Sequence, residues 1–185
     1  MSRRSIARLA ISLTILLLLI LPLSSCSDDD EGSPTDPGPA PGLGPNEDIY
    51  LNEDNGHYYQ AISGGFNWDA ARDSAAASTF EELTGHLVCV DDEQENLFLY
   101  NNLGKDVQRF FLGGFQDRQS EDYMEPDGAW YWCNGDTLSY SAWHTGEPNG
   151  GGLEHYMAFI WGDAPVWNDV PRSWDMSAGF IIEYE

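Results

Sequence analysis

Five oxygen-bearing side chains fall in two short stretches of the second half of the sequence. Glu147-Pro148-Asn149 is followed, after three glycines, by Glu154, and Trp167-Asn168-Asp169 comes later. Calcium takes about six to eight hard oxygen ligands in a flexible geometry, whereas zinc prefers nitrogen and sulfur. Three carboxylates and two amides therefore predict a calcium site. Its expected ligands are Glu147, Asn149, Glu154, Asn168 and Asp169.

The spacing within each stretch limits how these ligands can reach one ion. Neighbouring side chains of an extended chain point to opposite sides, so Glu147 and Asn149 can face the same way. A cis peptide bond at Pro148 would tighten that presentation, but only about 5–6% of such bonds are cis in folded proteins, so either isomer is open. Asn168 and Asp169 are adjacent, and both reach one ion only if the backbone bends or Asp169 also uses its carbonyl oxygen.

Two helices are expected in the first half of the domain. Asn67 predicts the cap of a helix that begins near Trp68, and Asp91 or Asp92 predicts the cap of a second helix. Gly85 is expected to break the chain between them. For the second helix, the expected inner face is Leu97, Phe98 and Leu103, and the expected end is Gly104.

Short strands are expected around and after the helices, separated by long polar stretches rich in Gly, Pro, Asn and Asp. The expected strands are residues 58–62, 86–90, 110–115, 130–132, 156–161 and 179–184. Helices followed by strands, rather than alternating with them, indicate an α+β fold. Long ordered loops without secondary structure of their own are usually functional.

The first 47 residues predict export and a lipid anchor. Three arginines precede an apolar run that is shorter than the ~20 residues of a spanning helix, as in an export signal. Leu23-Ser24-Ser25-Cys26 resembles a bacterial lipobox, which implies cleavage before Cys26 and lipidation of its sulfur. We therefore expect a signal peptide at 1–25, a lipidated acidic and Pro-rich tether at 26–47, and one domain at 48–185. Ser27, rather than Asp, favours the outer membrane and leaves open whether the domain faces the periplasm or the surface.

The charge balance excludes one class of partner. Three of the eight basic residues lie in the expected signal peptide, which leaves five against 31 acidic residues. Nucleic-acid binding depends on neutralising phosphates with Lys and Arg, so we expect no nucleic-acid partner. The only expected membrane contact is the lipid anchor.

The motifs together resemble the C-type lectin-like domain from about Gly56 to Glu183. The matching residues are Trp68, Ala71, Gly85-His86-Leu87-Val88, Asp92-Glu93-Gln94-Glu95-Asn96, Phe111-Leu112-Gly113-Gly114, Trp130-Tyr131-Trp132, Gly135, Trp143 and the two calcium stretches. The resemblance implies two helices with short antiparallel sheets and a long calcium-binding loop region. It also implies that the five calcium ligands contact sugar. The Glu-Pro-Asn order implies sugars of the mannose, glucose, N-acetylglucosamine or fucose type.

The cysteines depart from the family's pattern. Its disulfide positions fall near Ala75, Tyr156, Arg172 and Ile182, which are not cysteines. Cys89 and Cys133 lie elsewhere, and they either pair with each other or remain buried thiols. The family's auxiliary calcium site is incomplete, and a second ion stays open.

An enzyme is not expected. The four histidines lack zinc-protease spacing, and the sequence has neither a nucleophile elbow nor a phosphate-binding glycine loop. Glu147 and Glu154 could form a glycosidase pair, but carboxylates committed to calcium stay ionised and donate protons poorly. We expect calcium-dependent carbohydrate binding that serves adhesion or glycan recognition. A protein-binding or structural domain is the alternative, and the natural ligand and oligomeric state stay open.

Overall fold

The computed structural model describes residues 48–103, 108–160 and 164–185. The expected signal peptide, the lipidation site at Cys26, the tether and the helix end at Gly104 lie outside these residues. Among the helices within them, none has the length and apolar character needed to cross a membrane.

Both predicted helices are present with the predicted caps. Helix α1 spans Trp68–Ala76, and the Asn67 side chain accepts a hydrogen bond from the Ala70 N–H at 2.9 Å. Helix α2 spans Glu93–Asn102, and the Asp92 side chain accepts from the Glu95 N–H at 2.9 Å. Each cap satisfies an amide that has no partner within its own helix, which sets where the helix begins.

The predicted inner face of α2 is wrong at Leu97, whose side chain is 41% exposed. Phe98 and Leu103 do pack against the core, but the fully inward positions are Glu95, Asn96 and Leu99. Two of these are polar and satisfy their hydrogen bonds inside the domain. Their burial rotates the helix away from the face that hydrophobicity alone predicts.

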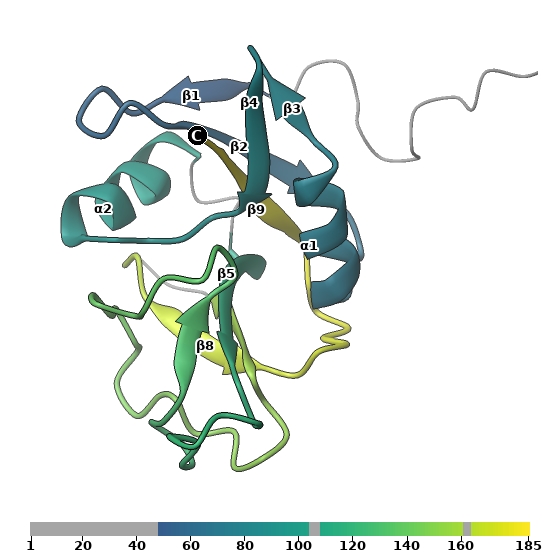
Figure 1. The fold of residues 1–185 in the computed structure, drawn as a ribbon, viewed down its shortest axis with the longest axis vertical. Helices are drawn as coiled ribbons and strands as arrows, with labels where there is room; N and C mark the ends of the chain where they lie inside the picture. The colour runs from purple at the N-terminus through teal and green to yellow at the C-terminus, as the bar shows by residue number, and fades with distance from the viewer. Residues whose placement is uncertain (1–47, 104–107, 161–163) are drawn as a thin grey trace, which may run out of the picture. The chain divides into compact units, whose positions relative to one another are not determined.

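Within the described residues, nine strands form a hydrogen-bonded sheet with the order β1-β2-β9-β5-β7-β8, with β4 also paired to β9, β3 to β4, and β6 to β5 (Figure 1). The strands are β1 Ile49–Leu51, β2 Tyr58–Ser63, β3 Thr79–Phe80, β4 Leu83–Leu87, β5 Phe110–Gln116, β6 Trp130–Trp132, β7 Tyr156–Phe159, β8 Trp167–Val170 and β9 Gly179–Tyr184. All pairs are antiparallel except β5 with β9, which run parallel. Helices and sheet together confirm the predicted α+β architecture.

Several strands differ from the sequence prediction. The largest shift is at β4, which begins and ends three residues earlier than the predicted strand 86–90, and β1 and β3 were not predicted. Gly85 lies inside β4 instead of breaking the chain. A glycine is needed there because β4 passes so close to α1 that a Cβ would lie 2.6 Å from the Ala75 carbonyl oxygen. Strand β7 ends at Phe159. Strand β8 was not predicted, because its centre is the polar pair Asn168-Asp169 and lacks the alternation of an ordinary half-buried strand.

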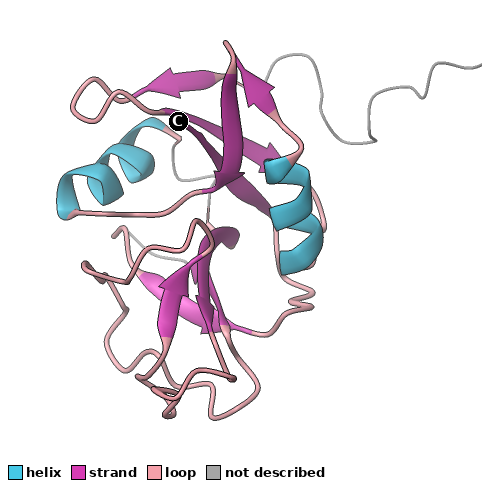
Figure 2. Ribbon diagram, viewed as in Figure 1, coloured by secondary structure: helices cyan, strands magenta, loops and turns pink. Residues whose placement is uncertain are grey.

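The core lies on both faces of the sheet. Ile181 belongs to one apolar cluster, while its strand neighbours Phe180 and Ile182 belong to the other, as expected from side chains that alternate along a strand. Long loops connect β5 with β6 and β6 with β7, and they reach the end of the domain away from β1 and β3 (Figure 1 and Figure 2). The candidate calcium residues lie in and beside these loops.

Candidate calcium site

Asp169 joins the two predicted stretches of ligands. Its side chain lies on β8 and is 1% exposed. The Asn149 N–H donates to both Asp169 carboxylate oxygens at 3.0 Å, and the Gly150 N–H donates to Oδ2 at 2.7 Å. The buried carboxylate therefore anchors the Glu147-to-Gly150 loop against the strand.

Gly150 allows Glu154 to reach the same place. A Cβ at position 150 would clash with the Glu154 Cβ and would lie 2.8 Å from Asp169 Oδ2. The side chains of Glu154 and Asp169 thus converge on one backbone position that only glycine leaves open. The glycine run has a steric role here in addition to its flexibility.

Glu147 completes a group of three carboxylates. The Glu147–Pro148 peptide bond is cis. Burial, then a hydrogen bond with Asp169 and the negative charges of Asp169 and Glu154, raise the pKa of Glu147 to about 7. Burial and the charge of Asp169 also raise the pKa of Glu154. Every charge that acts on these two carboxyls is negative, so the site concentrates negative charge that a cation would neutralise.

Two buried oxygen atoms of the predicted ligands have no hydrogen-bond partner, namely Oε2 of Glu147 and Oδ1 of Asn168. Buried polar atoms are nearly always hydrogen bonded, and an exception calls for an explanation such as a bound ion. Both atoms are hard oxygen donors of the kind that calcium prefers. The residues present therefore fit a calcium ion.

The fit is incomplete in three respects. Asn168 and Asp169 lie in unbroken register with Ala158 and Met157 of β7, so the chain does not bend between them, and only the alternative in which Asp169 also uses its carbonyl oxygen remains. Among the described His, Cys, Asp and Glu side chains, two groups of three bring ligand atoms within 4.8 Å of one another, and neither contains Glu147, Glu154 or Asp169. The side chain of Asn149 is exposed. The five residues as one ligand set therefore stay a prediction.

Asn96 is a positioning residue that the sequence did not single out for the site. Its Oδ1 accepts a hydrogen bond from the Trp167 indole N–H at 3.0 Å, and its Nδ2 donates to the Pro165 carbonyl oxygen at 2.6 Å. Asn96 thereby connects α2 to the start of β8, the strand that carries Asn168 and Asp169. Its only sequence signal was its place in the family-like α2 motif.

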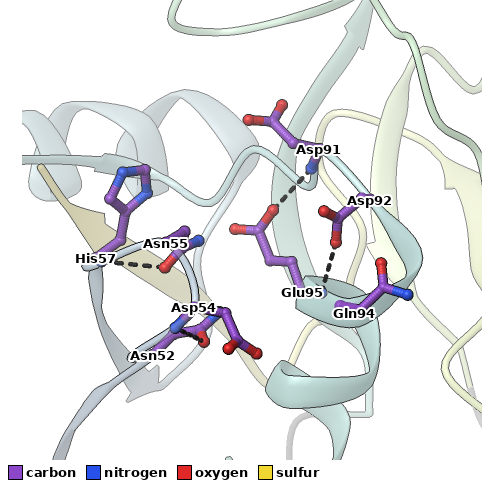
Figure 3. A pocket seen from close by; sticks show the side chains of 8 residues that line it. All are labelled: Asn52, Asp54, Asn55, His57, Asp91, Asp92, Gln94 and Glu95. Atoms are coloured by element: carbon purple, nitrogen blue, oxygen red, sulfur yellow. Dashed lines mark hydrogen bonds between the residues drawn. The ribbon is translucent and has the colours of Figure 1, made fainter.

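A second acidic region lies between the β1–β2 connection and the start of α2 (Figure 3). It is a pocket of about 150 Å³. Its lining residues are Asn52, Asp54, Asn55, His57, Asp91, Asp92, Gln94 and Glu95. Within it, Glu95 accepts from the Asp91 N–H at 2.7 Å and from the Tyr59 hydroxyl at 2.5 Å. Burial, followed by the charge of Glu183, raises the pKa of Glu95 to about 7.

Cys89 and Cys133 are free thiols in this structure, with their sulfur atoms 4.0 Å apart. A disulfide requires about 2.05 Å. The two cysteines are thus neighbours, and both expected alternatives, a disulfide between them or two buried thiols, remain predictions.

The raised carboxyl pKa values predict how the calcium-free domain responds to pH. A carboxyl whose pKa rises on folding adds stability below its unfolded pKa, about 4.3 for Glu, and that contribution is lost as the pH rises through its folded pKa. For Glu147 the folded value is about 7. We expect the full chain in chelator to have a lower Tm at pH 8 than at pH 5.5.

Glu147→Gln separates this effect from the general repulsion of an acidic chain. The variant should show a smaller loss of Tm between the two pH values than the parent chain, as followed by circular dichroism. A decrease in Tm between pH 5.5 and pH 8 equal to that of the parent chain would contradict the raised pKa of Glu147 beside Asp169 and Glu154. Glu95 titrates in the same range, so part of the pH dependence should remain.

Comparison with known proteins supports the fold. No family model matches the chain. It is 30% identical over 118 residues to a perlucin-like protein of Mytilus galloprovincialis, which covers 63% of this chain and 69% of that protein. The structure of the C-type lectin CEL-I from Cucumaria echinata matches with a TM-score of 0.60 at 18% identity, over 75% of this chain and 95% of that one.

The chain belongs to the C-type lectin-like family. It is also 29% identical over 116 residues to the hepatic lectin of Gallus gallus, and there it spans 48% of the relative's length. The match to halomucin of Haloquadratum walsbyi covers 1% of that protein at 28% identity. A calcium-independent type II antifreeze protein shares the C-type lectin-like fold with a TM-score of 0.55 at 20% identity, over 78% of this chain and 95% of that one. The fold therefore occurs both in lectins and in a protein that does not depend on calcium.

Proposed function

We propose that this C-type lectin-like domain binds carbohydrate through a calcium ion held by Glu147, Asn149, Glu154, Asn168 and Asp169. The observation that carries the proposal is that Oε2 of Glu147 and Oδ1 of Asn168 are both buried without a hydrogen-bond partner, while neighbouring negative charges raise the pKa values of Glu147 and Glu154. An apolar or purely structural loop would not need this arrangement, because each such oxygen costs about 1–3 kcal/mol when it stays unsatisfied.

The chain's own groups divide the work of binding. Asp169 holds the loop in place through the Asn149 and Gly150 amides, and Glu147 and Glu154 provide acceptors for sugar hydroxyl groups. The amides of Asn149 and Asn168 can donate to the oxygens of the same hydroxyls. A bound calcium ion supplies the positive charge that this set lacks and coordinates hydroxyl oxygens. Charge-assisted hydrogen bonds of this kind are about twice as strong as neutral ones.

The order Glu147-Pro148-Asn149 supports sugars of the mannose, glucose, N-acetylglucosamine or fucose type. The cow CD23 carbohydrate-recognition domain, solved in the presence of a GlcNAc2Man3 oligosaccharide, has the same fold with a TM-score of 0.54 at 22% identity. That likeness supports the choice of mannose as the first ligand to test. The three glycines at 150–152 place no side chain beside the site that could select further among sugars.

We also propose that the domain acts as an exported lipoprotein, anchored through Cys26 to the outer membrane and involved in adhesion or glycan recognition. The motif before Cys26 and the Pro-rich segment after it support this placement. A weak single-sugar contact would gain avidity from many copies on one surface. Mass spectrometry of the detergent-extracted chain tests it: an unprocessed amino terminus or an unmodified Cys26 would contradict the anchor.

Calorimetric titration of the full chain in detergent tests the function. We expect one calcium ion to bind at the Asp169 site, and methyl mannoside to bind only when calcium is present. The same titration of sugar in chelator is the control. Calcium binding without any monosaccharide binding would favour the alternative, a protein-binding or structural domain, which the calcium-independent antifreeze neighbour shows the fold can accommodate. Absence of calcium binding would overturn the proposal.

A further inference from the structure

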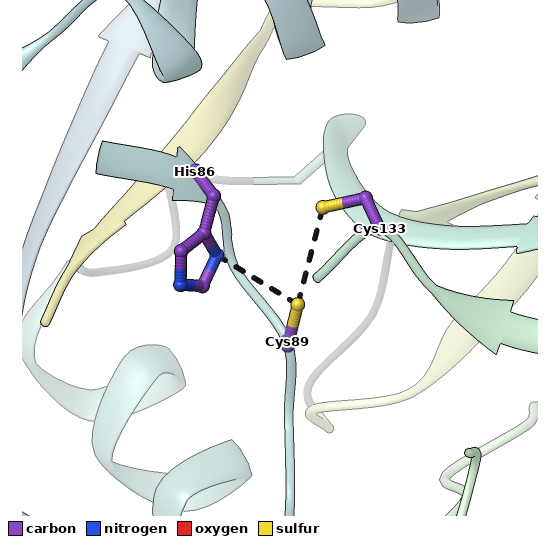
Figure 4. A group of neighbouring side chains, drawn as sticks. All are labelled: His86, Cys89 and Cys133. Atoms are coloured by element: carbon purple, nitrogen blue, oxygen red, sulfur yellow. Dashed lines mark hydrogen bonds between the residues drawn. The ribbon is translucent and has the colours of Figure 1, made fainter. Parts of the chain in front are cut away.

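A second cluster of metal-ligand side chains lies away from the calcium loops. His86 is in β4, Cys89 follows that strand, and Cys133 follows β6 (Figure 4). The Cys89 Sγ lies 3.7 Å from His86 Nδ1 and 4.0 Å from the Cys133 Sγ. All three ligand atoms lie within 4.8 Å of one another. Segments far apart in the sequence thus bring one imidazole and two thiols together.

These separations match the edges of a tetrahedral zinc site. Zinc bonds of about 2.3 Å to sulfur and about 2.0–2.1 Å to nitrogen imply ligand separations of about 3.8 Å between sulfurs and about 3.6 Å from sulfur to nitrogen. The observed distances are within a few tenths of an ångström of these values. We propose that His86, Cys89 and Cys133 bind a zinc ion independently of the calcium-dependent function.

The surroundings of His86 support ligation through Nδ1. Its Nε2 lies 3.0 Å from Glu185 Oε1, so the carboxylate can keep the proton on Nε2 when Nδ1, which lies 2.9 Å from the Leu87 carbonyl oxygen, gives up its own proton to bind a metal. Carboxylates paired in this way with metal-binding histidines orient the ring and raise its basicity. The imidazole is 19% exposed, which provides a route for the ion, whereas Cys89 is 3% exposed.

The backbone leaves room for the cluster and offers an oxygen atom as the fourth ligand. The Leu87 carbonyl oxygen lies 2.9 Å from His86 Nδ1, 3.3 Å from the Cys89 sulfur and 3.5 Å from the Cys133 sulfur. A Cβ at Gly113 would lie 2.9 Å from the Cys133 sulfur, so glycine in β5 permits the approach. The Leu87 oxygen or a water molecule can complete four-coordination.

The two thiols differ in acidity. A hydrogen bond from Cys89, and then one from His86, lower the pKa of Cys133 to about 6 despite its burial, whereas the hydrogen bond with Cys133 and burial raise the pKa of Cys89. Binding of zinc forms two Zn–S bonds and one Zn–N bond, and the protons still held by the Cys89 thiol and by Nδ1 leave to solvent. No electron is transferred. A Cys89–Cys133 disulfide would remove both sulfur ligands, so oxidation and zinc binding exclude each other.

Cobalt is a suitable probe, because a thiolate-to-cobalt charge-transfer band reports sulfur ligation directly. The full chain is reduced with a phosphine, placed in excess calcium to occupy the carboxylate site, and titrated with Co²⁺ and then Zn²⁺. We expect the band to saturate at one Co²⁺ per chain and to disappear when Zn²⁺ is added. It should be lost in Cys89→Ser and in Cys133→Ser.

Three further variants keep the test sharp. His57→Asn alters the neighbouring His57, Glu183 and Glu185 group, and Cys26→Ser removes the remaining cysteine; both should keep the band. Glu185→Gln should keep the band but weaken zinc binding by about ten- to hundredfold, the usual effect of losing such a carboxylate. The absence of a band in the reduced parent chain, a band that survives Cys133→Ser, or loss of the band in His57→Asn would each overturn the proposal.

Discussion

Asp169→Asn is expected to lower the calcium affinity of the domain by about a hundredfold and to abolish sugar binding with it. The substitution removes one negative charge and one carboxylate oxygen at 1% exposure, where water cannot substitute for either. A charged hydrogen-bond partner is worth about 1.5–3 kcal/mol, and about 1.4 kcal/mol corresponds to a factor of ten. Asparagine keeps one oxygen to accept from the Asn149 and Gly150 amides, so the loop should stay tied to β8.

Calorimetry of calcium and then of methyl mannoside measures both effects. Asp175→Asn is the matched control, because it makes the same change of charge on an exposed side chain outside the site. Calcium affinity within a factor of three of the parent chain would remove Asp169 from the ligand set. Sugar binding that survives the loss of calcium would place the sugar site elsewhere.

The double variant Glu147→Gln with Asn149→Asp is expected to retain calcium and to shift the sugar preference from mannose towards galactose by about tenfold. The exchange moves the carboxylate from position 147 to position 149 and the amide from 149 to 147. The total charge offered to the ion on the two sides of Pro148 is therefore unchanged. It reverses which position accepts and which donates a hydrogen bond. The paired hydroxyls of the sugar must then present their donors and acceptors in the opposite order. The free energy of one charge-assisted hydrogen bond is large enough to produce the tenfold change in sugar preference.

Competition between the two monosaccharides for the calcium-loaded chain measures the shift. Glu147→Gln alone is the informative comparison, since it removes a carboxylate without replacing it and should weaken calcium binding. The double variant should recover most of that loss. An unchanged preference in a double variant that still binds calcium would contradict direct contact of Glu147 and Asn149 with sugar.

Much of the architecture could be predicted from local patterns. Asn67 and Asp92 each precede a helical segment, and a capping side chain acts on an amide only three residues away, so sequence neighbours contain all the information. The apolar runs that became β5 and β9 were recognisable for a similar reason, because strand propensity and burial follow residue type. The donor chemistry of the candidate site was equally evident, since carboxylates and amides prefer hard cations in any fold.

The orientation of α2 could not be predicted in this way. Leu97 is exposed and Asn96 is buried because Trp167 and Pro165, far along the chain, supply the hydrogen bonds that make an inward amide stable. Hydrophobic pattern contains no information about such distant partners. The same holds for β8, whose polar centre became a strand because β7 lies beside it.

The sequence by itself thus determined which atoms could bind a cation and which family of folds could present them. Only the tertiary structure decided that Asp169 would hold the Asn149 amide, that Glu147 would share its burial with Asp169, and that His86 would meet two thiols. Ligand distances and pKa values depend on desolvation and on charges within a few ångströms, and folding alone brings those neighbours together.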